Sequence, residues 1–516
     1  MADPAVPAAD EGISSLLDTD LYKLTMQCAV LNFFPDVRVE YSFTNRTPHM
    51  RLTRRAFRWL HAQITALGTL AVTDAELAWL AKTCPYLGPE YLHYLQHLRL
   101  HPAEQVTLAF TATGADTGDA TPGDLDLRVH GNWAATILYE IPLLALTSEA
   151  YFKFVDTEWS HTSQTALAKA KGIALIRAGC LFSEFGTRRR RDRRTHELVM
   201  AGLVAAQREA DAHNHNHNSK PAPPDATNTN TNTNTDTDTA TAWPGKFTGT
   251  SNVHMAMRFG VAPVGTVAHE WFMAIAALTD DYARANERAL EYWTRTFGRG
   301  VLAIALTDTF GTPAFLRAFA RPAPKNTEAA AGEAESKTEG NGDGESEAEP
   351  KQPTYAQIFT GVRQDSGDPL EFIKLMQHFY ASQGITSPKT IVFSDSLNVD
   401  KCILYKRACA ATAQLAPAFG IGTFFTNDFV SASRSSAASA SSASSNKEKD
   451  VEGGKSAPLN VVIKLSRAGG RQAVKLSDDR GKNTGEDALV ARIKGEVGYT
   501  ERTVWEEGDE AHRWDR

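Results

Sequence analysis

The sequence contains few cysteines and no long hydrophobic run. Its 516 residues include five scattered cysteines without C-x-x-C spacing, so they suggest neither a zinc cage nor a disulfide framework. No run of eighteen apolar residues appears, which excludes an ordinary membrane-spanning helix. The first residues lack the positive start and apolar core of a signal peptide. We therefore expect a soluble protein of a reducing, cytoplasmic compartment.

The sequence also lacks a basic excess. Its formal net charge is −7, and residues 325–351 alone contribute −5, so the rest of the chain is close to neutral. Binding to nucleic acid or to an anionic membrane surface depends on a positively charged footprint. We therefore expect neither a membrane partner nor a specific nucleic-acid partner, and we look for small-molecule ligands instead.

Three internal segments and the N-terminus are too polar or too short of apolar residues to fold on their own. Residues 211–242 are rich in Asn and Thr, residues 324–352 in Glu, Gly and Ala, and residues 431–458 in Ser. Such compositions bury too little apolar surface to offset the entropy lost on ordering. We predict that these three insertions and residues 1–15 are disordered.

Apolar strands alternate with helical patterns in the second half of the chain. The segments 301–310, 361–369, 390–396 and 416–423 each begin apolar and end polar. This order is typical of a parallel sheet buried on both faces. We predict an α/β fold with a β/α barrel over residues 136–430. The alternative is an open doubly wound sheet, which the missing G-x-G-x-x-G turn disfavours.

The ends of the chain show a different pattern. Residues 37–46 and 125–131 alternate apolar and polar side chains as strands do, and residues 459–479 hold a probable hairpin around Gly469 and Gly470. We predict that these strands pair in a second, α+β domain. The domain would be built from residues 16–135 and 459–516.

Polar residues follow the predicted parallel strands where each strand ends. Because the C-terminal ends of barrel strands meet on one face, we expect these side chains to line one catalytic mouth. The residues at the strand ends are Asp308, Arg363, Asp365, Ser394, Asp395, Gly422 and Thr423. Arg363 and Asp365, together with Asp368, suit a divalent metal bridged to phosphates, although Asp368 is also a good helix cap.

Two earlier segments carry further candidates. Phe185 precedes Arg188 by three residues, and a ring beside a guanidinium suits an aromatic carboxylate. Arg188 also opens a run of arginines that, taken alone, is more typical of a solvated face or a nuclear import signal.

The second segment contains two Gly-Thr steps. Gly249, Thr250 and Ser251 offer amides and hydroxyls to phosphate oxygens, and His269 follows a second apolar segment that we expect to be a strand. Taken singly, either step is more often only a turn, and a lone histidine more often has a structural role.

Taken together, the motifs closely resemble those of the nicotinate phosphoribosyltransferase family, of the eukaryotic type. The matching motifs are TDLYKLTM (19–26), EIPLLALTSE (140–149), FGTRR (185–189), GTSNV (249–253), GTVAHE (265–270), TDTF (307–310), DSGDP (365–369), FSDSLN (393–398) and GIGT (420–423). The resemblance implies an irregular β/α barrel joined to a domain of both termini. It also implies transfer of 5-phosphoribosyl from phosphoribosyl pyrophosphate to nicotinate, with Mg²⁺ as cofactor. ATP hydrolysis is coupled through a phosphorylated histidine, which matches His269.

The resemblance also assigns roles to the other candidates. It places Asp308, Arg363 and Asp365 at the reacting groups, with both aspartates near the metal through the phosphates. It places Ser394, Asp395, Gly422 and Thr423 at the ribose and 5-phosphate.

The nicotinate ring is expected to stack on Phe185 beside Arg188. Its other face is expected to meet Tyr22 of a neighbouring subunit, which implies a homodimer. Ser251 stands where nicotinamide-using relatives carry an Asp, and a serine favours the acid because an Asp would repel a carboxylate.

Two alternatives stay open from sequence alone. One is a nicotinamide phosphoribosyltransferase, and the other is a non-catalytic binding relative that keeps the fold. The expected location is the cytoplasm, with the nucleus as a second location if the run from Arg188 to Arg194 acts as an import signal.

Overall fold

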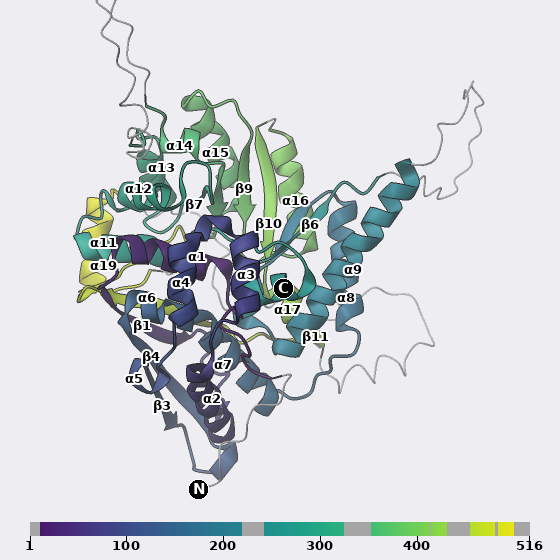
Figure 1. Cartoon of the computed structure of the whole chain (residues 1–516), viewed down its shortest axis with the longest axis vertical. Coiled ribbons are helices and arrows are strands. Elements are labelled where there is room, and N and C mark those ends of the chain that lie inside the picture. The colour runs from purple at the N-terminus through teal and green to yellow at the C-terminus, as the bar shows by residue number, and fades with distance from the viewer. Residues whose placement is uncertain are drawn as a thin grey trace, which may run out of the picture.

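The computed structural model describes residues 11–218, 242–324, 352–412, 414–430, 455–479 and 483–499. Two six-stranded sheets organise this part of the chain. The parallel sheet and its helices occupy the upper part of Figure 1, and the sheet containing β1, β3 and β4 occupies the lower left part.

The first sheet is parallel throughout. Its strand order is β6 (Lys246–Thr250), β5 (Leu181–Glu184), β10 (Leu415–Ile421), β9 (Lys389–Phe393), β8 (Gly361–Gln364) and β7 (Ile304–Leu306). The predicted α/β class with a parallel sheet is therefore confirmed. Among the described residues, pairing runs from β6 at one edge to β7 at the other, and closure of this sheet into a barrel stays a prediction.

Helices connect the parallel strands or flank the first and last of them along the chain. They are α8 (Gln164–Arg177), α9 (Arg193–Asn218), α10 (Val253–Phe259), α11 (His269–Thr279), α12 (Ala285–Phe297), α13 (Thr312–Phe319), α14 (Tyr355–Ile358), α15 (Pro369–Ser382), α16 (Val399–Ala410) and α17 (Thr423–Thr426). Asp368 caps α15, where its carboxylate accepts hydrogen bonds from the backbone of Leu370 and Glu371. The proline that follows is compatible with the first turn because its missing N–H would have no intrahelical partner there.

The second sheet joins both ends of the chain. Its order is β14 (Arg471–Gln472), β13 (Val461–Ala468), β1 (Arg38–Asn45), β4 (Pro122–Asn132) and β2 (Leu52–Thr53), and β3 (Val106–Ala112) also pairs with β4. All these pairs are antiparallel, and Tyr41 of β1 lies opposite both Leu465 and Val129. The predicted hairpin is present as β13 and β14. The exact domain boundaries stay predictions.

The remaining elements cover this second sheet or connect it to the first. They are α1 (Leu21–Phe33), α2 (Arg54–Ala66), α3 (Asp74–Thr83), α4 (Gly88–His97), α5 (Pro102–Gln105), α6 (Trp133–Thr136), α7 (Glu140–Phe154), α19 (Asp487–Glu496) and the short pair β11 (Phe429–Val430) and β12 (Lys455–Ser456). No single helix of the described chain is long and apolar enough to cross a membrane. Arg54–Thr69 with Asp74–Thr83 meets that test only as a pair bent by 79°.

The hydrophobic core extends through both sheets. Trp271 of α11 lies 6.0 Å from Trp133 of α6 and 6.0 Å from Trp293 of α12, measured between ring centroids. All three rings are buried, and aromatic pairs at this separation stabilise a core beyond their buried area. Because α11 also contacts β13, its first turn is held between the two sheets.

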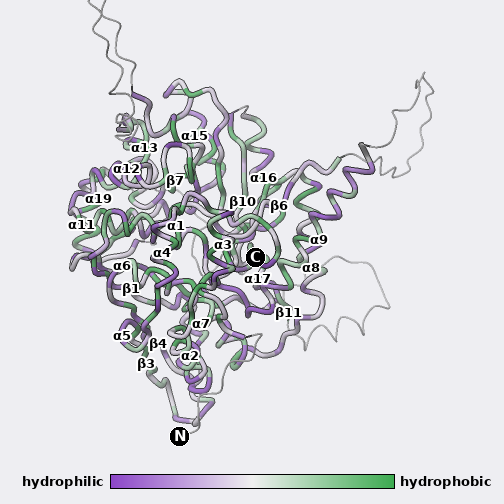
Figure 2. Tube along the Cα trace, in the orientation of Figure 1, coloured by the Kyte–Doolittle hydropathy of each residue, from purple (hydrophilic) through white to green (hydrophobic). Residues whose placement is uncertain are grey.

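Three predicted disordered segments are partly ordered. α9 continues to Asn218, inside the predicted insertion 211–242, because Asn214 exchanges two hydrogen bonds with the backbone of Trp243 and His213 stacks on the Trp243 ring. Figure 2 shows α9 becoming hydrophilic toward this end. Its polar composition therefore predicted disorder, although contacts with Trp243 hold the helix in place.

Tertiary contacts also order parts of the other two segments. At the N-terminus, the Gly12 amide donates to Glu149, so the prediction of disorder is wrong for residues 11–15. Residues 455–456 form β12 within the predicted insertion 431–458. Residues 1–10, 219–241, 325–351 and 431–454 lie outside the described residues.

Candidate active site

A cavity of about 260 Å³ lies where the C-terminal ends of the parallel strands meet β13. Residues that follow β5, β8, β9 and β10 form one side, and Val462, Ile463, Lys464 and Leu465 of β13 form another. The structure brings eleven of the predicted site residues to this wall. They are Tyr22, Phe185, Arg188, Ser251, His269, Arg363, Asp365, Ser394, Asp395, Gly422 and Thr423.

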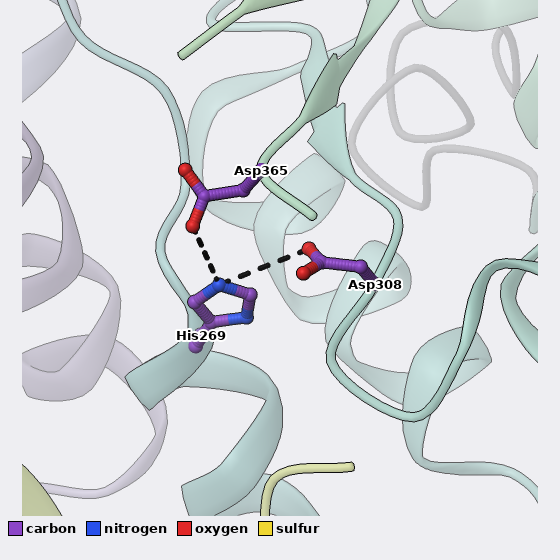
Figure 3. Close-up of side chains that lie close together, drawn as sticks. All are labelled: His269, Asp308 and Asp365. Atoms are coloured by element: carbon purple, nitrogen blue, oxygen red, sulfur yellow. Dashed lines mark hydrogen bonds and ion pairs between the residues drawn. The ribbon is translucent and has the colours of Figure 1, made fainter. Parts of the chain in front are cut away.

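His269 stands at one end of the cavity, on the first residue of α11. Its Nε2 lies 3.1 Å from Asp365 Oδ2 and 3.8 Å from Asp308 Oδ1, and Figure 3 shows both carboxylates directed at the ring. Its Nδ1 lies 3.0 Å from the Thr309 hydroxyl. The predicted strand before His269 is wrong, because α10 and an irregular segment lead into α11.

A lysine that the sequence analysis missed completes this end. The Lys475 ammonium group lies 2.8 Å from His269 Nε2 and 3.6 Å from Asp308 Oδ2. Burial, together with the nearby Lys475 charge, lowers the pKa of His269 against the opposing pull of the two aspartates. The lowered pKa favours the neutral ring, whose Nε2 accepts from Lys475 in the Nδ1–H tautomer and donates to Asp365 in the other tautomer.

Arg363 and Ser394 fix the position of Asp365. Arg363 Nη2 and the Ser394 hydroxyl donate to Asp365 Oδ1 at 2.7 and 2.8 Å. Burial alone would raise the pKa of Asp365, but Arg363, His269 and Lys475 hold it well below its usual range. Asp365 is therefore an anion at neutral pH. Arg363 and Ser394 also link the ends of β8 and β9, because Arg363 donates to the Ser394 hydroxyl.

The donor set at this end fits a divalent cation. Ligand atoms of His269, Asp308 and Asp365 all lie within 4.8 Å of one another. Asp308 is 1% exposed, and its Oδ1 has no hydrogen-bond partner. A buried carboxylate oxygen without a donor is costly, and carboxylate oxygens are the ligands that Mg²⁺ prefers.

Phe185 and Arg188 line a second part of the cavity, here called the Phe185 end. The Phe185 ring packs on the face of Gly420, where a side chain would collide with it. Arg188 lies on a short turn, Thr187–Arg189, and its Nη1 is 3.9 Å from Glu140 Oε1. Glu140, which also lines the cavity, is a second residue that the sequence analysis missed, although it opens the motif 140–149.

Tyr22 reaches this end from its own chain. It lines the same cavity as Phe185, and its hydroxyl lies 3.5 Å from Glu140 Oε2. We expected Tyr22 of a neighbouring subunit in this place. That reason for a homodimer is therefore wrong, because α1 of the same chain begins directly against the 249–253 segment, where the Leu21 amide donates to the Ser251 carbonyl.

Ser251 contacts a carboxyl group that the sequence analysis did not assign. Its hydroxyl donates to Asp20 Oδ1 at 2.8 Å, and the Thr187 hydroxyl donates to the same oxygen at 2.7 Å. Burial raises the pKa of Asp20, and the two hydroxyls oppose this only in part. Asp20 lies within the motif 19–26, so its position in that motif was the available signal.

Gly249 and Thr250 lie behind the cavity wall rather than on it. The Thr250 hydroxyl donates to the buried carboxylate of Glu184 at 2.6 Å. Gly249 adopts a φ of 137° beside the Ala262 carbonyl, where no side chain fits. They support the wall at Ser251, and the structure does not bring them to the cavity. Their prediction as substrate ligands stays a prediction.

Two arginines of the run after Arg188 are fully buried, although Arg194 is about half exposed. Arg190 and Arg191 are both 0% exposed. Arg190 makes two hydrogen bonds of 2.8 Å to Asp18, and the guanidinium of Arg191 lies 3.7 Å from the centre of the Phe152 ring. These side chains hold the turn that carries Arg188, and the import signal stays a prediction.

The ends of β9 and β10 form a polar edge of the cavity. The Ser396 hydroxyl donates to Asp395 at 3.0 Å, and Ser396 has a φ of 48°, which is uncommon for a residue with a side chain. Lys401 donates to the Ser396 carbonyl at 3.1 Å. Gly422 and Thr423 follow β10 at the same edge, so the predicted ribose and phosphate residues lie together.

Comparison with known proteins gives one consistent result. Residues 17–148 match the nicotinate phosphoribosyltransferase N-terminal domain, and residues 180–326 and 341–501 match the nicotinate phosphoribosyltransferase family. The nicotinate phosphoribosyltransferase of Saccharomyces cerevisiae is 40% identical over 97% of this chain and 99% of its own. The probable nicotinate phosphoribosyltransferase of Schizosaccharomyces pombe is 40% identical over 95% of this chain and 98% of its own.

Solved structures agree with the sequence relatives. A nicotinate phosphoribosyltransferase structure from Saccharomyces cerevisiae has a TM-score of 0.75 at 38% identity, covering 95% of this chain and 100% of that one. The Vibrio cholerae structure has a TM-score of 0.69 at 28% identity, covering 95% of each chain. The chain therefore belongs to the nicotinate phosphoribosyltransferase family of enzymes.

Proposed function

We propose that the chain transfers 5-phosphoribosyl from phosphoribosyl pyrophosphate to nicotinate, giving nicotinate mononucleotide and pyrophosphate for NAD salvage. We also propose that it couples this transfer to ATP hydrolysis through a phosphorylated His269. The observation that carries the proposal is one cavity lined by two groups of side chains. The first group is His269, Lys475 and Asp365, with Asp308 beside them, and the second group is Phe185 and Arg188.

The His269 end suits phosphoryl transfer from ATP. A neutral imidazole with its proton on Nδ1 presents the Nε2 lone pair as a nucleophile to the terminal phosphorus of ATP, and ADP leaves. Lys475, at 2.8 Å from Nε2, is placed to neutralise the oxygens of the transferred group. Thr309 holds the Nδ1 proton at 3.0 Å and keeps the ring in this orientation.

The same end suits departure of pyrophosphate from the sugar. Breaking the bond at C1 leaves positive charge on the ribose and negative charge on the leaving group. Arg363 offers cationic N–H groups there, and its guanidinium is fixed by Ser394 at 2.8 Å and by Thr266 at 3.2 Å. Donors that are fixed before the reaction stabilise developing charge without further reorganisation. The negative charge of the Asp365 carboxylate is compatible with the positive charge that develops on the ribose.

Asp308 and Asp365 would hold Mg²⁺ through their facing oxygens. The ion supplies neutralisation of phosphate oxygens when bound. The partnerless Oδ1 of Asp308 supports this assignment.

The Phe185 end suits a flat acidic heterocycle. The ring offers a stacking face, and Arg188 offers a two-pronged donor for a carboxylate. Tyr22 lines the same end and is placed to cover the other face of the substrate ring.

Asp20 is the observation that favours nicotinamide as an alternative substrate. Its carboxyl group contacts Ser251, so a carboxyl is present next to the serine that we took as selective for the acid. Because burial raises the pKa of Asp20, its neutral form is favoured relative to an exposed aspartate, and a neutral carboxyl repels nicotinate less. We therefore retain nicotinate as the substrate.

Isotope transfer tests the proposal directly. Labelled nicotinate and labelled nicotinamide are each incubated with phosphoribosyl pyrophosphate and Mg²⁺, with and without ATP. We expect mononucleotide from nicotinate, faster with ATP, and stoichiometric release of ADP. Faster product formation from nicotinamide would refute the substrate assignment, and a rate indifferent to ATP would refute the coupling.

Three further features are proposed with the function. Convergence of the strand ends on one cavity supports a barrel-like curvature of the parallel sheet. A homodimer is proposed from the family resemblance alone, and light scattering of the purified chain tests it. A cytoplasmic location is proposed from composition, with the nucleus as a second location. Burial of Arg190 and Arg191 leaves fewer arginines of the run accessible to an import receptor in the folded protein.

A further inference from the structure

We propose that the turn formed by residues 475–479 is a positioning element for phosphoryl transfer at His269. The inference rests on the proposed coupling to ATP and goes beyond it, because it assigns a positioning role to Ser366 and Asp479, which contact neither His269 nor Lys475. The turn follows β14 in the C-terminal part of the chain, far in sequence from the loops that it contacts.

The turn holds the loop after β7 at two points. The Leu476 amide donates to the Thr309 carbonyl at 2.8 Å, and Thr309 is the residue whose hydroxyl contacts His269 Nδ1. Asp478 Oδ1 accepts from the Thr312 amide at 2.9 Å, and its Oδ2 accepts from the Thr312 hydroxyl at 2.5 Å. Asp308 directly precedes the first of these two points, Thr309.

The turn also holds the loop after β8, and through it the side chain of Asp308. Asp479 Oδ1 accepts from the Gly367 amide at 2.8 Å. The Asp478 amide donates to the Ser366 hydroxyl at 3.0 Å, and that hydroxyl donates to Asp308 Oδ2 at 2.5 Å. Ser366 therefore has its one proton directed at Asp308, which leaves the other Asp308 oxygen facing His269.

The backbone of the turn is itself held in an uncommon conformation. Ser477 has a φ of 66° and is 0% exposed, and the Tyr499 hydroxyl donates to its carbonyl at 3.0 Å. A residue other than glycine keeps such a conformation only where its surroundings hold it. The turn therefore connects the loops after β7 and β8 through its hydrogen bonds, and it places Lys475 next to His269. We call this turn, with its contacts, the bracket. Asp479 and Ser366 are positioning residues of this bracket.

Four variants of the full chain test the inference. Asp479→Ala removes the acceptor for Gly367, Asp479→Asn keeps an acceptor oxygen, and Ser366→Ala removes the donor to Asp308. Ser382→Ala is the matched control, because Ser382 is exposed at the end of α15. The measurements are the rate of acid-labile His269 labelling from γ-labelled ATP, the kcat and KM of nicotinate transfer, and the unfolding temperature.

We expect Asp479→Ala and Ser366→Ala to lower the labelling rate and the ATP-coupled kcat by about tenfold, because small displacements of reacting groups are costly. The KM for nicotinate stays within about twofold, since that substrate binds at the other end. Asp479→Asn recovers most of the rate, and Ser382→Ala behaves as the wild type.

Wild-type labelling in both Asp479→Ala and Ser366→Ala would overturn the inference, as would an Asn variant no better than the Ala variant at equal unfolding temperature. If Asp479→Ala does not fold, Ser366→Ala decides alone. A wild-type chain that forms product but takes no label from ATP would refute the proposed coupling itself, which distinguishes the two failures.

Discussion

The two ends of the cavity are built by different means. At the Phe185 end, Thr187 and Ser251 hold Asp20 through their hydroxyls, and the ion pair of Arg188 with Glu140 is longer, at 3.9 Å. At the His269 end, charged groups hold one another: Arg363 contacts Asp365, and Lys475 contacts both His269 and Asp308. Electrostatic contacts in a buried site are strong and non-additive. Substitutions at the His269 end should therefore lower the ATP-coupled kcat, and substitutions at the Phe185 end should raise the KM for nicotinate.

The largest difference is expected from His269→Ala. The variant should lose ATP-stimulated transfer by about a hundredfold or more, because the phosphoryl acceptor is gone, while slow ATP-independent transfer persists. Steady-state rates with and without ATP, and the ratio of ADP to mononucleotide, measure this.

His378→Ala, an exposed histidine on α15, is the control and should match the wild type. ADP release that still equals product formation in His269→Ala would remove His269 from the coupling.

Lys475→Met should produce the next largest loss. Methionine keeps the length of the side chain without its charge, so the ammonium contact with His269 Nε2 is lost. We expect kcat with ATP to fall by about thirtyfold, a typical cost for a fixed cationic donor, with little change in the KM for nicotinate. Lys374→Met, on the exposed face of α15, serves as control. A rise in the nicotinate KM as large as the fall in kcat would show that the two ends are not separate.

Phe185→Leu should weaken nicotinate binding at the Phe185 end. Loss of ring stacking costs about 1 kcal/mol, so the KM for nicotinate should rise about five- to tenfold. The ratio of ADP to product should stay at its wild-type value, because leucine changes no charge near His269. Initial rates over a range of nicotinate concentrations give the KM. A variant with unchanged KM but lost coupling would contradict the division of the cavity.

The sequence was sufficient to predict site residues that stand directly at the end of a recognisable apolar strand. Strand ends predicted by apolar runs brought Asp308, Arg363, Asp365 and Ser394 together, because parallel strands direct their C-terminal ends to one edge. It was not sufficient for Lys475, which lies in a hairpin segment with no chemical motif around it. Its approach to His269 depends on tertiary packing of β13 against α11, which local patterns do not encode.

A similar limit applies at the other end. Tyr22 and Asp20 face the cavity of their own chain. They do so because α1 packs in space against the 249–253 segment and the turn at Thr187. Spacing in the sequence could not distinguish this from a contribution by a second subunit. The ordered end of α9 was missed for the same reason, because Trp243, which anchors Asn214, follows a long polar segment.

Glu149→Gln should affect stability without affecting either end. Glu149 is buried on α7, where it accepts from the Gly12 amide, and burial raises its pKa to about 7 from its ordinary value of 4.5. The folded chain therefore binds this proton more tightly than the unfolded chain. Glu149 accordingly costs stability as pH rises from about 4.5 to 7, and the full cost is present above that range.

At pH 8 the glutamine variant should be more stable than the wild type by on the order of 1–3 kcal/mol, and at pH 4.5 the two should be nearly equal. Thermal unfolding at both pH values measures this, and kcat should be unchanged. Equal stability at pH 8 would contradict the raised pKa.

The smallest effect is expected from replacing residues 431–454 with Asn-Gly. Val430 of β11 lies opposite Lys455 of β12, and a two-residue Asn-Gly turn joins such a pair. The pair is anchored independently of that segment, because Arg191 donates to Ser456 at 2.9 Å and its guanidinium lies 4.3 Å from the Phe429 ring. Both the nicotinate KM and the ADP ratio should stay within about twofold, since the strand pair that bounds the segment keeps its contacts. A change confined to the nicotinate KM would instead tie this segment to the Phe185 end, whose turn is braced by Arg190 and Arg191 next to the same hairpin.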